Sequence, residues 1–391
     1  MSNFRVTIPV SADAGRVTMK TISRWLLAAA FLFSISNLSV AGDPIVLGQS
    51  AALSGPASML GTEMARGLNA YFNQVNEHGG VNGHLIKLIT LDDGYEPERT
   101  IKNTQTLINE DKAVALIGYV GTPTSVAVLK DVKAANLPFI GPYTGADSLR
   151  DGKYDNIYNI RASYNDEALR IAKEFDGMGL HRVGVVAQND AFGQAGLRAI
   201  QAAVKQYPEM KLVWTESVER NSINVQSAVT KISSEKVDLV YVVSTYATTG
   251  ELIKKARGAG YVGVFSTLSF VGAEPLAQSA GNAAQGVMIP AVMPSPHSEP
   301  TALSSEYRKA IAHGASNGVY SYASMEGYVA ARVIVEALKR INGNVTSEAI
   351  EKELRSLHVD LCGFTVDFTK SHNASQWVES TMIGAGGKIT R

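Results

Sequence analysis

Residues 118–125 have the composition of a turn that leads from a buried strand into a helix. They read Gly-Tyr-Val-Gly-Thr-Pro-Thr-Ser, after an apolar run at 113–117 and before apolar residues at helical spacing. Thr122 is a suitable N-cap, and Pro123 suits the first helical position because its missing N–H leaves no donor unpaired there. The free N–H groups and the positive dipole end of such a helix attract a carboxylate or another small anion. A capped helix start without a ligand is the alternative.

A second loop with hydrogen-bonding groups follows the next expected strand, at Tyr143-Thr144-Gly145. Strands are expected at 44–49, 85–91, 113–117 and 137–141, with helices between them. This alternation predicts βαβ units and a parallel sheet, in which ligands bind beyond the carboxyl ends of the strands. The two loops are therefore expected at the same edge of one sheet.

The alternation of strands and helices begins again after Arg161. Strands are expected at 183–187, 212–216, 239–243 and 264–267, and helices at 167–178, 191–206, 225–233 and 250–259. This second run indicates a second α/β domain of like architecture. Three later helices are expected, and residues 364–368 and 377–383 are predicted to be antiparallel strands that close the chain.

Residues 1–41 have the pattern of a secretory signal peptide. Lys20 and Arg24 form the basic region, the apolar region follows at 25–35, and Ser39-Val40-Ala41 is a small-x-small cleavage site. The apolar run is too short to span a bilayer of about 30 Å as a helix. An uncleaved membrane anchor is the alternative. Residues 1–18 do not fit the signal pattern and are interpreted as an extension of the start site.

Composition narrows the classes of function. The full sequence has a net charge of zero. Residues 1–41 carry four basic groups and one acid, so the mature form has a net charge of −3. No run of Lys or Arg occurs, which argues against nucleic acid as a partner. The one cysteine, Cys362, leaves no internal disulfide. The mature chain of about 350 residues is long enough for two domains with real cores.

A series of motifs resembles the branched-chain amino-acid binding proteins, which are periplasmic substrate-binding components of ABC transporters. These motifs are Ser54-Gly55-Pro56, Gly61, residues 75–83, Asp92-Asp93-Gly94 before Pro97, Ile117-Gly118 and residues 188–193. The resemblance covers nearly the whole mature chain. It implies an α/β fold of two Rossmann-like lobes with parallel sheets, joined by three crossovers, with the ligand cleft between the lobes.

The resemblance also implies where the lobes begin and end. The crossovers map near 161–162, 292–294 and 376. The first lobe is then expected at 42–161 plus 294–375, and the second at 162–293 plus 376–391.

By the same resemblance, the first lobe holds a ligand carboxylate at Gly121 and Thr122 and at the loop Tyr143-Thr144-Gly145. The remaining expected ligand-binding residues are Tyr164, Asp166, Phe192, Thr245, Tyr246 and Ser269. Aromatic residues on cleft loops can simply pack the loops, but at matched positions they favour a ligand. The aromatic residues Tyr164, Phe192, Tyr246 and Phe270 favour a ligand with an apolar or aromatic body.

The sequence departs from the family pattern at two positions. The acidic residue that pairs with an α-ammonium group maps onto Ser269, and a serine cannot neutralise a buried charge. Either Asp166 takes over that role or the ligand lacks an ammonium group. The aromatic residue beside Gly61 is Leu60 here. An aromatic or branched carboxylate therefore fits the pocket at least as well as leucine.

Motifs for catalysis and cofactors do not support an enzyme. Residues 258–263 match G-x-G-x-x-G, but they follow a helix and precede a strand, the reverse of the dinucleotide-binding order, and are interpreted as a helix stop. No nucleophile elbow occurs, and the seven histidines lack metal-ligand spacing. We expect no catalytic residue, cofactor or metal.

The leading hypothesis is an exported, periplasmic, monomeric receptor of an ABC importer. It would close like a hinge on a small carboxylate, an amino acid or an aromatic or branched acid, and deliver it to a membrane permease. One alternative is a ligand sensor of the same fold for a membrane signalling protein. Another is a secreted hydrolase, which the lack of a nucleophile–base motif argues against.

Overall fold

The computed structural model describes residues 42–298, 301–314 and 319–391. The predicted signal peptide at 1–41 lies outside these residues. Among the helices in the described ranges, none is both long and apolar enough to cross a membrane.

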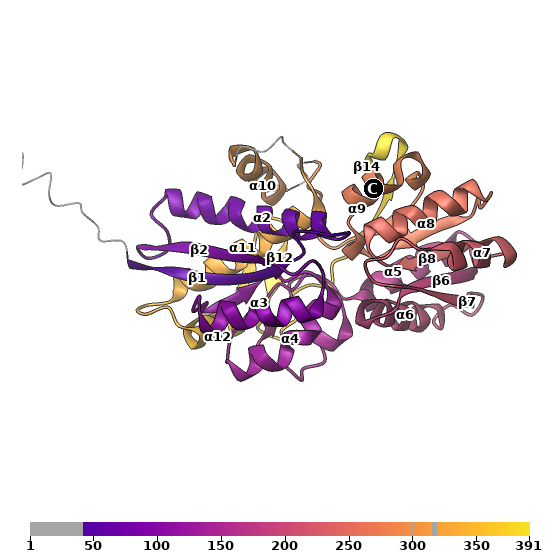
Figure 1. Cartoon of the computed structure of the whole chain (residues 1–391). Coiled ribbons are helices and arrows are strands. Elements are labelled where there is room, and N and C mark those ends of the chain that lie inside the picture. Colours follow the sequence, from indigo (N-terminus) through magenta and orange to yellow (C-terminus); the bar gives the residue numbers. More distant parts are fainter. Residues whose placement is uncertain (1–41, 299–300, 315–318) are drawn as a thin grey trace, which may run out of the picture. The chain divides into compact units, whose positions relative to one another are not determined.

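The first sheet has five strands in the order β2-β1-β3-β4-β5 (Figure 1). They are β1 (Gly42–Ala51), β2 (His84–Asp92), β3 (Ala115–Ile117), β4 (Phe139–Ile140) and β5 (Ile157–Tyr158). The pairs β1–β3, β3–β4 and β4–β5 are parallel. Every residue of β3 is buried, as expected of a central strand covered on both faces. The carboxyl end of β3 leads directly into the turn that contains Gly121.

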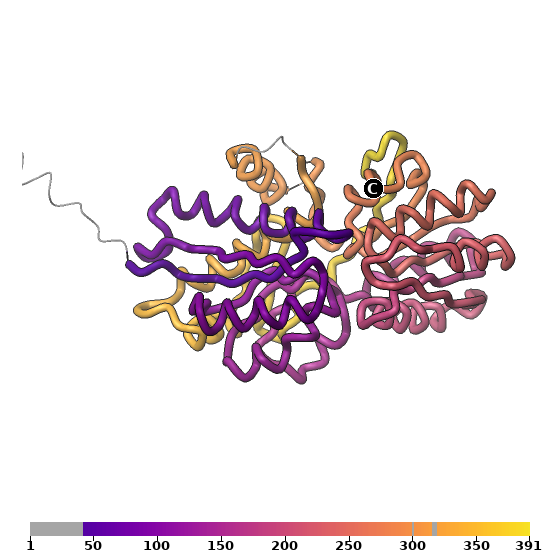
Figure 2. The backbone as a smooth tube through the Cα atoms, in the orientation of Figure 1, coloured from indigo at the N-terminus to yellow at the C-terminus, as the bar shows by residue number. Residues whose placement is uncertain are grey.

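Helices from two distant parts of the chain pack around this first sheet. They are α2 (Ser58–Glu77), α3 (Pro97–Asn109) and α4 (Thr122–Ala134), and later α10 (Ala302–His313), α11 (Tyr322–Arg340) and α12 (Ser347–Arg355). Helix α11 packs against α2, and Figure 2 shows the orange returning segment beside the indigo one. The contact is close because a Cβ on Gly67 would lie 1.9 Å from the carbonyl oxygen of Ser324. Helix α11 is thereby held over the first lobe.

The second sheet has seven strands in the order β14-β13-β10-β9-β8-β6-β7. They are β6 (Arg182–Gln188), β7 (Lys211–Val218), β8 (Leu239–Val243), β9 (Val264–Thr267), β10 (Met288–Ala291), β13 (Glu379–Ile383) and β14 (Ile389–Thr390). Its helices are α5 (Tyr164–Gly177), α6 (Ala191–Val204), α7 (Gln226–Ser234), α8 (Tyr246–Gly258) and α9 (Ala273–Ala280). Strands β6 to β10 are parallel to one another, whereas β13 pairs with β10 in the antiparallel direction.

The α/β fold with two mainly parallel sheets confirms the predicted fold class. The two closing strands are antiparallel, as predicted, but each pairs with a different partner. Strand β12 (Thr365–Asp367) pairs with β11 (His358–Asp360) in a small separate sheet, whereas β13 joins the second sheet. The lobe boundaries mapped from the family resemblance stay a prediction.

Candidate functional site

The amino-terminal turn of α4 is buried. Its N-cap is Gly121, whose φ of +105° is a conformation that favours glycine. The prediction of Thr122 as the N-cap is wrong by one residue, because the helix begins at Thr122. The Thr122 hydroxyl instead forms a hydrogen bond of 2.7 Å with the hydroxyl of Thr144.

Three polar groups in this turn have no protein partner within the described residues. The backbone N–H groups of Thr122 and Thr124 donate to no acceptor there, and no side chain caps the helix. The buried hydroxyl of Ser125 likewise has no hydrogen-bond partner there. Unpaired donors at the positive end of a helix dipole favour an anion. The turn therefore has the chemistry that its sequence predicts.

The two predicted carboxylate loops meet the start of α5. The Thr144 hydroxyl donates to the Tyr164 hydroxyl over 3.1 Å, and the Tyr164 amide donates to the carbonyl of Gly145 over 2.8 Å. A Cβ on Gly145 would lie 2.6 Å from Cδ1 of Tyr164, so only glycine allows this approach. Burial raises the pKa of Tyr164 to about 12, which keeps its hydroxyl protonated at neutral pH. The structure thus brings Thr122, Thr144, Gly145 and Tyr164 together.

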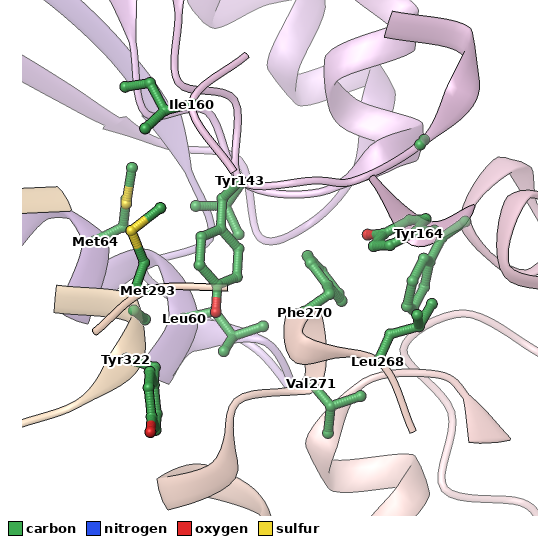
Figure 3. Close-up of a cluster of buried hydrophobic side chains, with 14 of the residues drawn as sticks. Leu60, Met64, Tyr143, Ile160, Tyr164, Leu268, Phe270, Val271, Met293 and Tyr322 are labelled. Carbon is green, nitrogen blue, oxygen red and sulfur yellow. The ribbon is translucent and has the colours of Figure 1, made fainter. Parts of the chain in front are cut away.

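Five buried aromatic side chains form an aromatic cluster beside these loops: Tyr95, Tyr143, Tyr164, Phe192 and Phe270. The ring centroid of Phe270 lies 4.6 Å from that of Phe192, 5.7 Å from that of Tyr143 and 6.0 Å from that of Tyr95. Figure 3 shows Phe270 between Tyr143 and Tyr164. All five side chains are at most 1% exposed, so they form closed apolar packing next to the polar turn of α4.

Tyr95 is a member of this cluster that the sequence analysis missed. It has a φ of +65°, rare for a residue with a side chain, and its amide donates to Asp93 over 2.9 Å. A Cβ on Gly121 would lie 2.2 Å from Cε2 of Tyr95, so the ring packs directly on the α4 turn. The Gln188 amide donates to the Tyr95 hydroxyl over 3.4 Å. An aromatic residue straight after the turn at the end of β2 is the signal that could have found it.

A buried charge cluster next to Tyr143 consists of Arg161, Glu167 and Glu326. Both carboxylates approach the guanidinium to 3.7 Å. The Arg161 Cζ lies 4.7 Å from the centroid of the Tyr143 ring. Burial raises the pKa of Glu326 to about 7; the nearby charge of Arg161 opposes this rise, and that of Glu167 adds to it.

Ser269 connects this charge cluster to the predicted site. The Ser269 amide and hydroxyl donate to the two oxygens of Glu167 over 2.7 and 2.8 Å, and Arg161 donates to the same hydroxyl. A small cavity beside it offers about 10 Å³ for the centre of a water molecule, room for one such group. Its lining includes Tyr143, Arg161, Ser269, Met293, Tyr322 and Glu326.

Comparison with known proteins identifies the family. The sequence model described as periplasmic binding protein matches residues 44–388. The chain belongs to the periplasmic binding protein family. This confirms the resemblance inferred from the motifs.

Named relatives agree with this assignment. A solved structure of a possible leucine/isoleucine/valine-binding protein from Rhodopirellula baltica SH 1 is 30% identical, has a TM-score of 0.84, and is matched over 91% of this chain and 97% of that one. An amino acid binding protein of Pseudomonas aeruginosa is 24% identical over 81% of this chain and 85% of its own length. The Leu/Ile/Val-binding protein of Escherichia coli K12 is 22% identical over 68% of this chain and 71% of its own length.

The remaining residues predicted to bind ligand in this binding protein have other partners. Thr245 is the N-cap residue of α8, and its hydroxyl lies 3.2 Å from that of Thr248. The Tyr246 hydroxyl accepts from the Met59 amide over 3.3 Å. Asp166 forms a capping box with Ser163 and lines an open surface groove. The Asp166 carboxylate therefore bonds to Ser163, whereas its neighbour Glu167 bonds to Ser269 in the buried charge cluster.

Glu167 and Glu326 were also missed by the sequence analysis. Glu167 shares an apolar face of α5 with Ile171 and Phe175, so its helical spacing already indicates burial. Glu326 is a charged residue inside the almost entirely buried stretch 322–331 of α11. A carboxylate within such an apolar face is the available signal, but its partner Arg161 lies far away in sequence.

Proposed function

We propose that this binding protein is the exported solute receptor of an ABC importer and that its ligand is a small carboxylate. The observation that carries the proposal is the buried, uncapped turn of α4. A carboxylate supplies the acceptors that the amides of Thr122 and Thr124 and the hydroxyl of Ser125 lack within the described residues. The adjacent aromatic cluster suits an apolar or aromatic ligand body.

The family membership supports a binding role rather than catalysis. Relatives are named as binding proteins for leucine, isoleucine and valine, and such ligands combine a carboxylate with an apolar body. A receptor of this kind acts as a periplasmic monomer that presents its ligand to a membrane permease. Opening and closing of the lobes about the crossovers would admit and then retain the ligand.

Contacts between the lobes support such a closure. The Arg220 guanidinium, after β7, pairs with Glu96 before α3 at 2.8 Å, and the Asn221 side chain donates to the same carboxylate over 2.7 Å. Tyr246 contacts the start of α2 through Met59. We infer that these contacts break when the lobes separate and form again around the ligand.

A thermal-shift screen tests the ligand class. The mature protein is mixed with amino acids, their deaminated acids, sugars and cationic amines. A ligand at about 100 times its dissociation constant adds about 2.7 kcal/mol to the free energy of unfolding, which shifts the melting temperature visibly. We expect stabilisation by carboxylates with branched or aromatic bodies. Stabilisation by sugars or carboxylate-free cations alone would contradict the proposal.

A further inference from the structure

We propose that Glu326 accepts a hydrogen bond from an ammonium group of the ligand, so that the ligand is an amino acid and not a deaminated acid. This inference rests on the proposed function, in which a carboxylate ligand binds beside the α4 turn. It assigns the counter-charge to a residue of α11 rather than to Asp166 or to the position of Ser269.

The buried charge cluster contains one cation and two carboxylates. Glu167 is satisfied, because both of its oxygens accept hydrogen bonds from Ser269 and Arg161 lies 3.7 Å away. Glu326 is only 3% exposed, and within the described residues no group donates a hydrogen bond to it. A buried carboxylate without a donor is costly unless a further partner binds it.

Arg150 is the other cation near this cluster, and its hydrogen bonds go elsewhere. Its guanidinium donates to the carbonyl oxygens of Thr144 and Ala162 over 3.2 and 3.5 Å and to the Asn373 side chain over 3.3 Å. These are neutral acceptors. Arg150 therefore provides no hydrogen bond to Glu326.

Arg161 does not supply the hydrogen bond that Glu326 lacks. Its Nε and Nη1 atoms are buried and have no hydrogen-bond partner within the described residues, and Nη1 lies 3.7 Å from Glu326. A carboxylate at this cavity would meet Glu326 with like charge, whereas an ammonium group there would face two carboxylates and one guanidinium. An amino acid supplies a donor for Glu326 through its ammonium group, while its carboxylate is bound at the α4 turn.

The small cavity places this pair next to the predicted carboxylate loops. Glu326 and Arg161 line it together with Tyr143 and Ser269. Tyr143 directly precedes Thr144, whose hydroxyl contacts that of Thr122. Room for one water-sized group suits an ammonium group, which donates up to three hydrogen bonds. Ser269 positions Glu167 through two hydrogen bonds.

The test is isothermal titration calorimetry with three ligand pairs: leucine and 4-methylpentanoate, valine and 3-methylbutanoate, and phenylalanine and 3-phenylpropanoate. We expect the wild type to prefer the amino acid of a binding pair by about tenfold to hundredfold, the range for a hydrogen bond to a charged group. Glu326→Gln should remove most of that preference while changing the affinity for the deaminated acid much less. Glu336→Gln, at a partly exposed position of α11 where Glu336 pairs with Lys339, is the matched control and should keep the preference.

Several outcomes would overturn the inference. Equal affinity of the wild type for both members of a pair would show that the protein does not recognise the ammonium group. An equal loss for both members in Glu326→Gln would show that the cavity holds only water or has a structural role. If Asp166→Asn loses the preference and Glu326→Gln does not, Asp166 rather than Glu326 pairs with the ammonium group. If Glu326→Gln fails to fold, Glu326→Asp keeps the charge and should retain part of the preference. Failure of every carboxylate to bind would instead reject the proposed function itself.

Discussion

At the scale of single residues, Thr122 illustrates how a site residue can be found for a partly wrong reason. Its sequence context indicates a helix cap, yet its hydroxyl contacts Thr144 and Gly121 takes the cap position. The hydroxyl pair leaves the amides of the turn without a competing side-chain acceptor. Thr122 therefore belongs to the candidate site through Thr144 rather than through capping.

We predict that Thr122→Val leaves the fold intact and weakens carboxylate binding by about 1–3 kcal/mol, because the buried Thr144 hydroxyl loses one of its hydrogen-bond partners. Calorimetry with the best ligand from the screen measures the change. Thr230→Val is the control, since that hydroxyl lies on an exposed face of α7 and contacts only the carbonyl of Gln226. Unchanged affinity in Thr122→Val would remove this residue from the site.

The raised pKa of Glu326 predicts that the free energy of unfolding depends on pH. Its pKa rises by burial from the ordinary 4.5 to about 7, so the folded state binds the proton more tightly than the unfolded state. Stability from this group is complete below pH 4.5 and is lost as pH rises toward 7. The loss amounts to roughly 3 kcal/mol at most, at 1.36 kcal/mol for each pKa unit.

Urea unfolding of the ligand-free protein between pH 4 and 8 measures this effect. The free energy of unfolding of the wild type should fall relative to that of Glu326→Gln as pH rises from 4.5 to 7. Arg161 and Glu167 are present in both proteins, so the difference reports mainly on Glu326. Parallel pH profiles would contradict a raised pKa for this carboxylate.

At the scale of elements, the sequence predicts long buried strands better than short ones. Strands such as β6 and β8 are continuous apolar runs because helices cover both faces of the sheet. Strands β5 and β14 have two residues each, and their pairing depends on tertiary neighbours rather than on local pattern. The partner of β12 was unpredictable for the same reason.

The candidate site likewise contains residues that the local sequence can place and one that only tertiary packing places. The sequence places Thr122 and Thr144 at strand ends of one parallel sheet, which meet at one edge, and the family resemblance adds Tyr164. Their role in ligand binding stays a prediction. Glu326 could not be placed, because α11 returns to the first lobe from far along the chain. Its contact with Arg161 at 3.7 Å depends on the close packing of α11 against α2.

At the scale of the whole molecule, the candidate site combines groups from segments of both large sheets. The α4 turn and α11 belong with the first sheet, whereas Phe192 and Phe270 come from segments of the second. Polar contacts such as Arg220 with Glu96 join the lobes outside the aromatic cluster. We infer that closing of the lobes removes the ligand from water and so strengthens its hydrogen bonds with the α4 turn.

The central claim is that the α4 turn binds the carboxylate of the ligand. A crystal structure of the mature protein with the most strongly stabilising acid tests it most directly. We expect a carboxylate oxygen at about 2.7–3.1 Å from the amides of Thr122 and Thr124, with the apolar body against Phe192 and Phe270. A carboxylate bound by the second lobe alone, or outside the aromatic cluster, would contradict it.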